Sequence, residues 1–166
     1  IDGTEASGKG TLGKKIAEHF DFHYLDTGIL YRVVAFSLQY DSDFSKISAQ
    51  KVQNALNLLT NKNFNITSLR NEKITQKASE ISKNKIVRDS LLSYQRDFAF
   101  QNGGSVLDGR DIGTVVCPDA DVKIFVDADV KIRAKRRYDQ LFINNKDLLL
   151  KNILNDLSKR DNLDTN

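Results

Sequence analysis

The chain has 166 residues, of which 40% are hydrophobic and 28% charged, a composition typical of one folded domain. Lys and Arg number 25 against 22 acidic residues, and the net charge of +3 is too small to indicate a surface that coats nucleic acid. One cysteine excludes an internal disulfide framework and a zinc site built from cysteines. With no apolar run long enough to span a membrane and no secretory leader, we expect a cytoplasmic protein.

The first part of the chain predicts two helices with a strand between them. Residues 9–20 place apolar side chains four residues apart, which is typical of an amphipathic helix. A second helix is expected to begin at Asp26 or Thr27, either of which can cap it, and to run to residue 38. The short apolar segment 22–25 is typical of a strand. Since the chain lacks an initial Met, we also expect further residues at both ends.

The middle of the chain is less informative. Residues 41–71 are polar, with weak helical periodicity at 52–59, and residues 74–100 again have a helical pattern. No break within this last segment is defined by the pattern.

The last part of the chain predicts two buried strands followed by two helices. The strands are expected at 105–107 and 122–126, and each ends in carboxylates, at the edge where open α/β sheets bind ligands. A strongly basic helix is expected at 130–142 and a last helix at 151–159. This alternation of strands and helices predicts an α/β fold.

The glycine-rich stretch "IDGTEASGKGTL" predicts a phosphate-binding loop. Gly3, Gly8 and Lys9 fit the pattern G-x-x-x-x-G-K-[ST], in which backbone N–H groups and the lysine bind phosphate oxygens. Gly10 stands where a hydroxyl usually ligates Mg²⁺, and the hydroxyl arrives one residue later, at Thr11. We therefore expect Mg²⁺ to be held by phosphate oxygens and water. The alternative is a glycine-rich turn that only caps a helix.

The stretch "HYLDTGILYR" places Asp26, Thr27, Tyr31 and Arg32 on the first turns of a helix, where they can face one cleft. The alternative is that Asp26 and Thr27 only cap the helix and that Arg32 is solvated. Both interpretations remain open from the residues alone.

The stretch "LDGRDIGTVV" places three charged residues after a strand. Asp108 can hold a magnesium-bound water, Arg110 can bind a phosphate with two hydrogen bonds, and Asp111 can accept a hydrogen bond from an amine. The alternative is a tight turn satisfied by its own aspartates.

The basic helix carries Lys131, Arg133, Lys135, Arg136 and Arg137. Arg133 and Arg137 are four residues apart and share a face, so they can close over a transferring phosphoryl group as arginine fingers do. A charge run of this kind is otherwise a solvated face, and Lys135 is expected to be solvated.

Five segments together carry a resemblance: "GTEASGKGT", "FHYLDTGILYR", "LDGRDIGTVVCPDADVKIFVDA", "RAKRRYDQL" and "SKRDNLDTN". In this order and spacing they resemble the bacterial cytidylate kinases, a family of nucleoside monophosphate kinases. The resemblance implies a P-loop NTPase fold, with a central parallel sheet flanked by helices, a monophosphate-binding insert and a small helical lid. It implies transfer of the γ-phosphoryl group of Mg-ATP to CMP or dCMP.

The same resemblance implies a single kinase domain over residues 1–166. Its core comprises about residues 1–34 and 99–166, the insert about 35–98, and the lid about 131–145. ATP, CMP or dCMP and Mg²⁺ are the implied small-molecule partners, and we expect a monomer that binds neither nucleic acid nor a membrane.

The resemblance also assigns roles to individual residues. Lys9, Arg133 and Arg137 match the family's phosphate loop and lid and are the implied catalytic positions. Asp108 is added to them from its place at the end of a strand, where it can hold Mg²⁺ through water, and no direct protein ligand to the metal is expected. The positions that match the ATP-phosphate site are Gly3, Ser7, Gly8, Lys9, Gly10 and Thr11. The positions that match the CMP site are Thr27, Tyr31, Arg32, Ser79, Arg88, Arg110, Asp111, Arg160 and Asp164, of which Ser79, Arg88 and Asp111 read the cytosine edge.

The chain departs from the family pattern in three places. Ala6 stands where the family usually has glycine, the stretch before Arg70 is shorter than the family's insert, and the chain stops at Asn166. Two rival functions remain: another small-molecule P-loop kinase, which should lack the combination of Ser79, Arg88 and Asp111, or a nucleotide-binding module that has lost catalysis, which Ala6 and the short insert would mark. RNA binding through the basic helix is disfavoured, because no aromatic stacking platform accompanies it.

Overall fold

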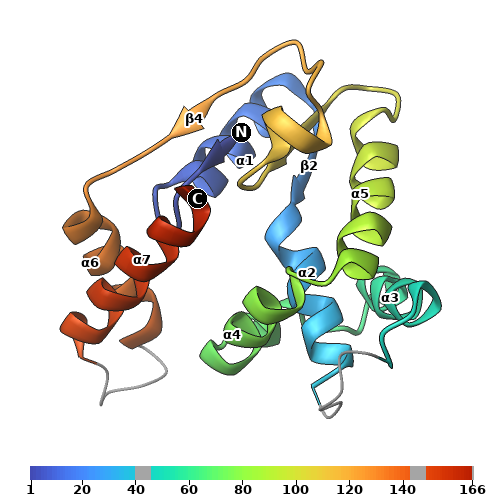
Figure 1. The fold of residues 1–166 in the computed structure, drawn as a ribbon. Helices are drawn as coiled ribbons and strands as arrows, with labels where there is room; N and C mark the ends of the chain where they lie inside the picture. The colour runs from blue at the N-terminus through green and yellow to red at the C-terminus, as the bar shows by residue number, and fades with distance from the viewer. Residues whose placement is uncertain (40–45, 143–148, 166) are drawn as a thin grey trace. The chain divides into compact units, whose positions relative to one another are not determined.

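The computed structural model describes residues 1–39, 46–142 and 149–165, and the side chains of 141, 142 and 162–165 lie outside this description (Figure 1). The contacts within the chain divide it into two compact units. Unit 1 comprises Ile1–Tyr24 and Val106–Asn166, and unit 2 comprises Leu25–Ser105.

The first strand of unit 1 is very short and packs tightly on its neighbour. β1 (Asp2–Gly3) pairs in parallel with β4 (Phe125–Val126), with Asp2 opposite Phe125 and Gly3 opposite Val126. A Cβ on Gly3 would lie 2.1 Å from the carbonyl oxygen of Val126. Only glycine therefore allows the two strands to approach so closely.

A second two-stranded sheet consists of β2 (His23–Asp26) and β3 (Ser105–Asp108). The backbone N–H of Gly109 donates to the carbonyl oxygen of Ile1 at 3.0 Å, and the amino group of Ile1 donates to the carbonyl oxygen of Leu107 at 2.7 Å. These bonds and a parallel bridge at Gly109 place β1 between β3 and β4. In the described residues, the expected central sheet is thus present as two short two-stranded sheets joined by this bridge.

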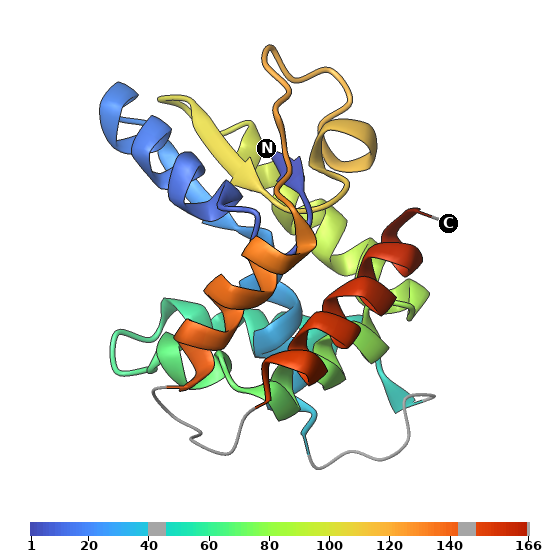
Figure 2. The same ribbon diagram turned by 90° about the vertical axis from the view of Figure 1, so that its left-hand side faces the viewer.

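Unit 1 also contains helices α1 (Lys9–Phe20), α6 (Val130–Phe142) and α7 (Leu150–Thr165), and a π-helical turn, η4 (Ile112–Val116). α6 and α7 lie side by side (Figure 2). The buried side chains at their contact are Ala134, Ile153 and Leu157, with Val130, Tyr138 and Leu154 packed around them.

Unit 2 is helical. Its elements are α2 (Thr27–Ser37), α3 (Ala49–Leu56), the 3₁₀ turns η2 (Asn57–Thr60) and η3 (Ile66–Leu69), α4 (Glu72–Ile81) and α5 (Lys85–Ala99). α2 packs against both α3 and α4. Its core contains the fully buried side chains of Leu30, Val33, Val34, Val52, Leu69, Ile81, Val87 and Leu91. The apolar stripes of these helices therefore converge on one core.

The predicted helices at 9–20 and 130–142 are confirmed, and several other boundaries are corrected. The helical segment 74–100 is two helices, because the side chain of Asn84 accepts hydrogen bonds from the backbone N–H groups of Ile86 and Val87 and so starts α5. The segment 52–59 begins earlier, at Ala49, because Ser48 caps α3, and it ends in a 3₁₀ turn.

The strand expected at 122–126 is reduced to Phe125–Val126, because only these residues pair with β1. The strands expected at 22–25 and 105–107 each extend to an aspartate, at Asp26 and Asp108. The helix expected at 151–159 continues to Thr165. None of the helices in the described ranges is long and apolar enough to cross a membrane.

Candidate functional site

The loop between β1 and α1 carries the predicted phosphate-binding sequence. The backbone N–H of Ser7 donates to the carbonyl oxygen of Thr4 at 3.4 Å, and the Lys9 Nζ donates to the same oxygen at 3.2 Å. Gly8 has a φ of 104°, and α1 starts directly after it. The lysine therefore folds back along a tight loop whose exit is the positive end of a helix, an arrangement that suits an anion.

Ala6 occupies a backbone conformation that favours glycine. Its φ is 59°, in the left-handed region, where the Cβ of other residues is crowded by the backbone. Alanine in place of the family's usual glycine at position 6 therefore strains the backbone of the loop.

Ser7 is a buried residue of the same loop. Its side chain is 5% exposed, and its Oγ has no hydrogen-bond partner among the described residues. The Oγ lies 3.3 Å from the point where a Cβ on Gly3 would stand. The hydroxyl thus faces the end of β1, whereas Thr11 is exposed.

Gly10 lies against a buried carboxylate. A Cβ on Gly10 would stand 2.9 Å from Oδ2 of Asp108 and 3.4 Å from the Tyr24 hydroxyl. Asp108 is 4% exposed, and the Tyr24 hydroxyl donates a hydrogen bond to its Oδ2 at 3.1 Å. The space that a side chain after Lys9 would need is therefore taken by the strand-end carboxylate.

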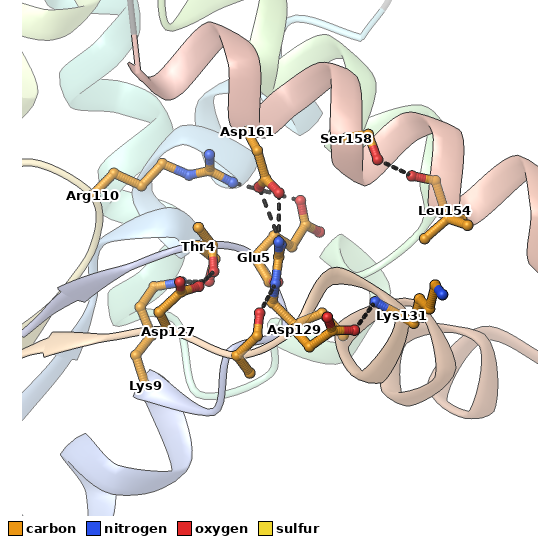
Figure 3. Close-up of polar contacts among 12 residues, drawn as sticks. Thr4, Glu5, Lys9, Arg110, Asp127, Asp129, Lys131, Leu154, Ser158 and Asp161 are labelled. Atoms are coloured by element: carbon orange, nitrogen blue, oxygen red, sulfur yellow. Dashed lines mark hydrogen bonds and ion pairs between the residues drawn. The ribbon is translucent and has the colours of Figure 1, made fainter.

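Both strand ends bring a carboxylate to the loop region, as the sequence predicts. Asp108 ends β3 beside Gly10, and Asp127 follows β4 and accepts a hydrogen bond from the Thr4 hydroxyl at 3.0 Å (Figure 3). The carboxyl edge of the strands in unit 1 is thus the edge where the chemistry-bearing side chains gather.

The turn after β3 is held by a residue that sequence reasoning did not identify. The carboxylate of Asp2 accepts the backbone N–H groups of Ile112 and Gly113, both at 2.8 Å. The alternative of a turn satisfied by its own aspartates is therefore incomplete. Asp111 is exposed, and its backbone carbonyl accepts the first bonds of η4, so its side chain projects from a fixed turn.

Glu5, in the middle of the loop, contacts three arginines that lie far apart in the sequence. Its Oε2 accepts a hydrogen bond from Arg160 Nη1 at 2.6 Å. Arg110 Nη2 lies 3.6 Å from Oε2, and Arg137 Nε lies 3.7 Å from Oε1. We call Arg110, Arg137 and Arg160 the arginine cluster. Three of the predicted site residues are thus brought together by a carboxylate that was not predicted.

The buried side chain of Arg133 links α6 to two other parts of unit 1. This side chain is 4% exposed, and its Nη1 and Nη2 donate hydrogen bonds to the Asp161 carboxylate at 3.1 and 2.5 Å. Its Nε and Nη1 also donate to the carbonyl oxygens of Ala128 and Glu5. These contacts join α6 to α7 and to the phosphate loop.

Two neighbours on α6 behave differently. Arg136 Nη1 donates to the carbonyl oxygens of Ala6 and Ser7 at 3.4 and 2.9 Å, so it contacts the loop backbone. Lys135 is solvated, as expected, and its hydrogen bond to Asp139 raises the pKa of the lysine.

The "LDTG" motif lies in unit 2 and forms a small charged group at the start of α2. A Cβ on Gly28 would lie 3.0 Å from Asp26 Oδ1 and 3.2 Å from Arg32 Nη1, so glycine leaves room for the arginine to fold back. Asp26 makes no side-chain cap, contrary to expectation, and instead pairs with Arg70 at 3.2 Å. Thr27 is buried in the first turn.

The other predicted CMP residues of unit 2 lie on three helices. Tyr31 is half-buried on α2, Ser79 is half-buried on α4, and Arg88 is exposed in the first turn of α5. In unit 1, Asp164 belongs to α7, but its side chain lies outside the described residues, as does the part of the predicted lid at 143–145.

The residues missed by sequence reasoning share one property. Glu5, Asp2, Tyr24 and Asp161 act through partners between 28 and 155 positions away, and no local pattern marks such pairs. The one available signal was Glu5 itself, an acidic residue in a loop predicted to bind anions.

No group of three or more His, Cys, Asp or Glu side chains gathers to bind a metal ion in the part of the chain that the structure describes. Asp108 is nevertheless a buried carboxylate beside the loop, and carboxylate oxygens suit Mg²⁺ or its bound water. The donor set therefore fits a magnesium held mainly by a nucleotide, with one carboxylate nearby.

Comparisons with known proteins give a consistent picture. A family model described as cytidylate kinase matches residues 1–166. The chain is similar to the cytidylate kinase of Bradyrhizobium diazoefficiens, with 45% identity over 166 residues that cover 100% of this chain and 78% of that protein. It is also similar to the cytidylate kinase of Bartonella tribocorum, with 44% identity over 99% of this chain and 76% of that protein. The cytidylate kinase of Nitrobacter winogradskyi is 45% identical over 100% of this chain and 78% of that protein.

Proposed function

This chain belongs to the cytidylate kinase family, and we propose that its phosphate loop and the arginines around that loop perform the family's reaction. The protein is an ATP-dependent phosphotransferase that transfers the γ-phosphoryl group of ATP to CMP or dCMP and gives ADP with CDP or dCDP. The observation that carries the assignment of residues is the gathering of Arg110, Arg137 and Arg160 at the phosphate loop. Such positive charge suits a group that bears negative charge throughout its transfer.

The ATP phosphates are assigned to the loop Gly3–Thr11. Lys9 would supply one full charge to the β- and γ-phosphates, while the backbone N–H groups of Gly8 and Gly10 would bind phosphate oxygens. The fold-back of Lys9 onto Thr4 supports this assignment, because it holds the ammonium group over the loop.

Mg²⁺ is the proposed cofactor, and it would neutralise charge on the phosphates when bound. Asp108 would hold one of its water ligands, since the carboxylate is buried beside Gly10 and oriented by Tyr24. Gly10 supports this role, because a larger residue would displace that carboxylate.

The residues proposed for CMP are those at the positions that match the family's CMP site. Thr27, Tyr31, Arg32 and Arg110 would bind the CMP phosphate, Ser79, Arg88 and Asp111 would read the cytosine edge, and Arg160 and Asp164 would bind near the sugar and phosphate. A cytosine presents an amine donor, a carbonyl and a ring nitrogen, and a carboxylate, a guanidinium and a hydroxyl complement these groups. The fold-back of Arg32 over Gly28 supports the first assignment.

No general base is required, because the attacking phosphate oxygen is already ionised. Positioning and electrostatic stabilisation then supply most of the catalysis. Arg133 and Arg137 are the proposed lid residues, and closure of a lid at about 131–145 would exclude water from the phosphoryl group. The proposed insert is about 35–98, and we expect a cytoplasmic monomer with a P-loop NTPase core.

The decisive experiment is a coupled assay of ADP formation with Mg-ATP and CMP, dCMP, UMP, AMP or GMP, and with no acceptor. Formation of ADP that depends strongly on CMP or dCMP is the expected result. ADP formation that depends on a different acceptor would favour another P-loop kinase. Equal ADP formation with and without acceptors, or none, would favour a binding module without catalysis.

A further inference from the structure

Glu5 places a negative charge inside a loop that otherwise attracts anions. Its carboxylate side chain is 15% exposed, and it lies between Gly3 and Gly8 in the stretch assigned to the ATP phosphates. A carboxylate at this place is attracted by the arginines in the ligand-free protein and repelled by a bound phosphate. The Glu5 carboxylate therefore opposes phosphate binding by the loop unless the side chain moves away.

The arginine cluster is incompletely satisfied by this carboxylate. Arg160 is within hydrogen-bond distance of Glu5, at 2.6 Å, whereas Arg110 and Arg137 lie at 3.6 and 3.7 Å and make only ion pairs with it. Three positive charges face one negative charge in these contacts. A phosphoryl group carries more charge and three terminal oxygens, so it can accept hydrogen bonds from all three guanidinium groups.

The backbone around Glu5 is held independently of its side chain. Arg133 donates to the carbonyl oxygen of Glu5, and Arg136 donates to those of Ala6 and Ser7. Arg133 is in turn paired with Asp161. The Glu5 carboxylate can therefore rotate away while the loop keeps its conformation.

We propose that Glu5 is a built-in competitor for the phosphate site, whose carboxylate holds the arginine cluster in the ligand-free enzyme and is displaced when a substrate phosphate binds. This inference rests on the proposed function, because it assigns nucleotide phosphates to the loop. The negative charge of the carboxylate offsets the repulsion among the three arginines. Because a phosphate must displace it from them, the carboxylate also lowers the affinity for phosphate. Glu5 is thus a positioning residue that sets how tightly phosphate is held.

The test is binding of inorganic pyrophosphate to the full chain, measured by calorimetry and by thermal unfolding at low salt. Glu5→Gln should bind pyrophosphate about three- to tenfold more tightly than the wild type, because a neutral amide competes less well for the arginines. Without pyrophosphate its Tm should fall below that of the wild type, and pyrophosphate should raise it by more. Glu18→Gln removes the same charge from an exposed position on α1 and should behave as the wild type.

Equal or weaker pyrophosphate binding by Glu5→Gln would overturn the proposal, since a permanent structural role predicts that outcome. Glu5→Asp keeps the charge and shortens the side chain, so it should also bind pyrophosphate more tightly if Glu5→Gln does not fold. In the wild type, the carboxyl carbon-13 signal of Glu5, one of four glutamates, should shift on addition of pyrophosphate. An unchanged signal at saturation would equally contradict displacement.

Pyrophosphate binding requires neither CMP nor turnover. A protein inactive in the ADP assay would still report on Glu5, and an active protein with unchanged pyrophosphate affinity in Glu5→Gln would contradict only the competitor role. The two conclusions are therefore tested separately.

Discussion

Oδ2 of Asp108 lies 2.9 Å from the point where a Cβ on Gly10 would stand. The carboxylate is buried and receives a hydrogen bond from Tyr24, so it cannot give way without losing that bond. The residue directly after the loop lysine is therefore glycine for a steric reason, and the variant "GKGT" is a consequence of the strand-end aspartate.

Gly10→Ala is expected to lower kcat with CMP by about 10- to 100-fold, because it displaces a carboxylate proposed to orient the magnesium-bound water. Steady-state kinetics at saturating ATP measures this. If Gly10→Ala lowers kcat by displacing Asp108, then adding Gly10→Ala to an Asp108→Ala variant should lower kcat little further. Fully additive losses in the double mutant would argue against this explanation.

Lys9→Ala is expected to reduce turnover by roughly 1,000-fold or more, because it removes the full charge beside the phosphates. The fold should survive, since the Lys9 side chain is only half-buried and its ammonium group donates to a backbone carbonyl, that of Thr4, and fills no part of the apolar core. Lys15→Ala, on the exposed face of α1, is the matched control. A Lys9→Ala protein with normal kcat/KM would exclude the proposed mechanism.

Ala6→Gly is expected to stabilise the protein by about 1 kcal/mol, because it relieves the left-handed backbone at φ 59°. Urea denaturation followed by circular dichroism measures the free energy of unfolding. Ala17→Gly, inside α1, should instead destabilise the protein, since glycine weakens a helix interior. A loss of stability in Ala6→Gly would show that the loop tolerates alanine without strain.

Asp161→Asn is expected to destabilise the protein by about 2 kcal/mol, because it leaves the buried charge of Arg133 without its carboxylate. Asp156→Asn changes an exposed aspartate of the same helix and should have little effect on the free energy of unfolding. Equal stability of the two variants in urea denaturation would mean that the Arg133 pair contributes nothing to holding α6 and α7.

Asp111→Asn is expected to lower kcat/KM for CMP by about 30- to 1,000-fold and to affect UMP less, because the carboxylate is proposed to accept from the cytosine amine. The ratio of kcat/KM for CMP and UMP is the informative quantity. Asp119→Asn, exposed and nearby in the sequence, should leave this ratio unchanged. An unchanged ratio in Asp111→Asn would assign base selection to other residues.

The sequence by itself was sufficient for the features that depend on neighbouring residues. Four-residue apolar spacing predicted α1, a run of basic residues after a strand predicted the helix α6, and the position of the glycines and Lys9 predicted the loop between β1 and α1. The buried apolar run at 105–107 predicted β3, although the strand continues one residue further, to Asp108. These features are local because helix periodicity and turn conformation are set within a few residues.

Only the tertiary structure decided which charges meet. Glu5 contacts Arg160 across 155 positions, and Arg133 meets Asp161 across 28, because α6 and α7 pack through a shared apolar contact and present their arginines to the loop. Asp26, expected to cap a helix, pairs instead with Arg70, 44 positions away. A charged side chain has many possible partners in a sequence, and the packing of the apolar faces selects the one it reaches.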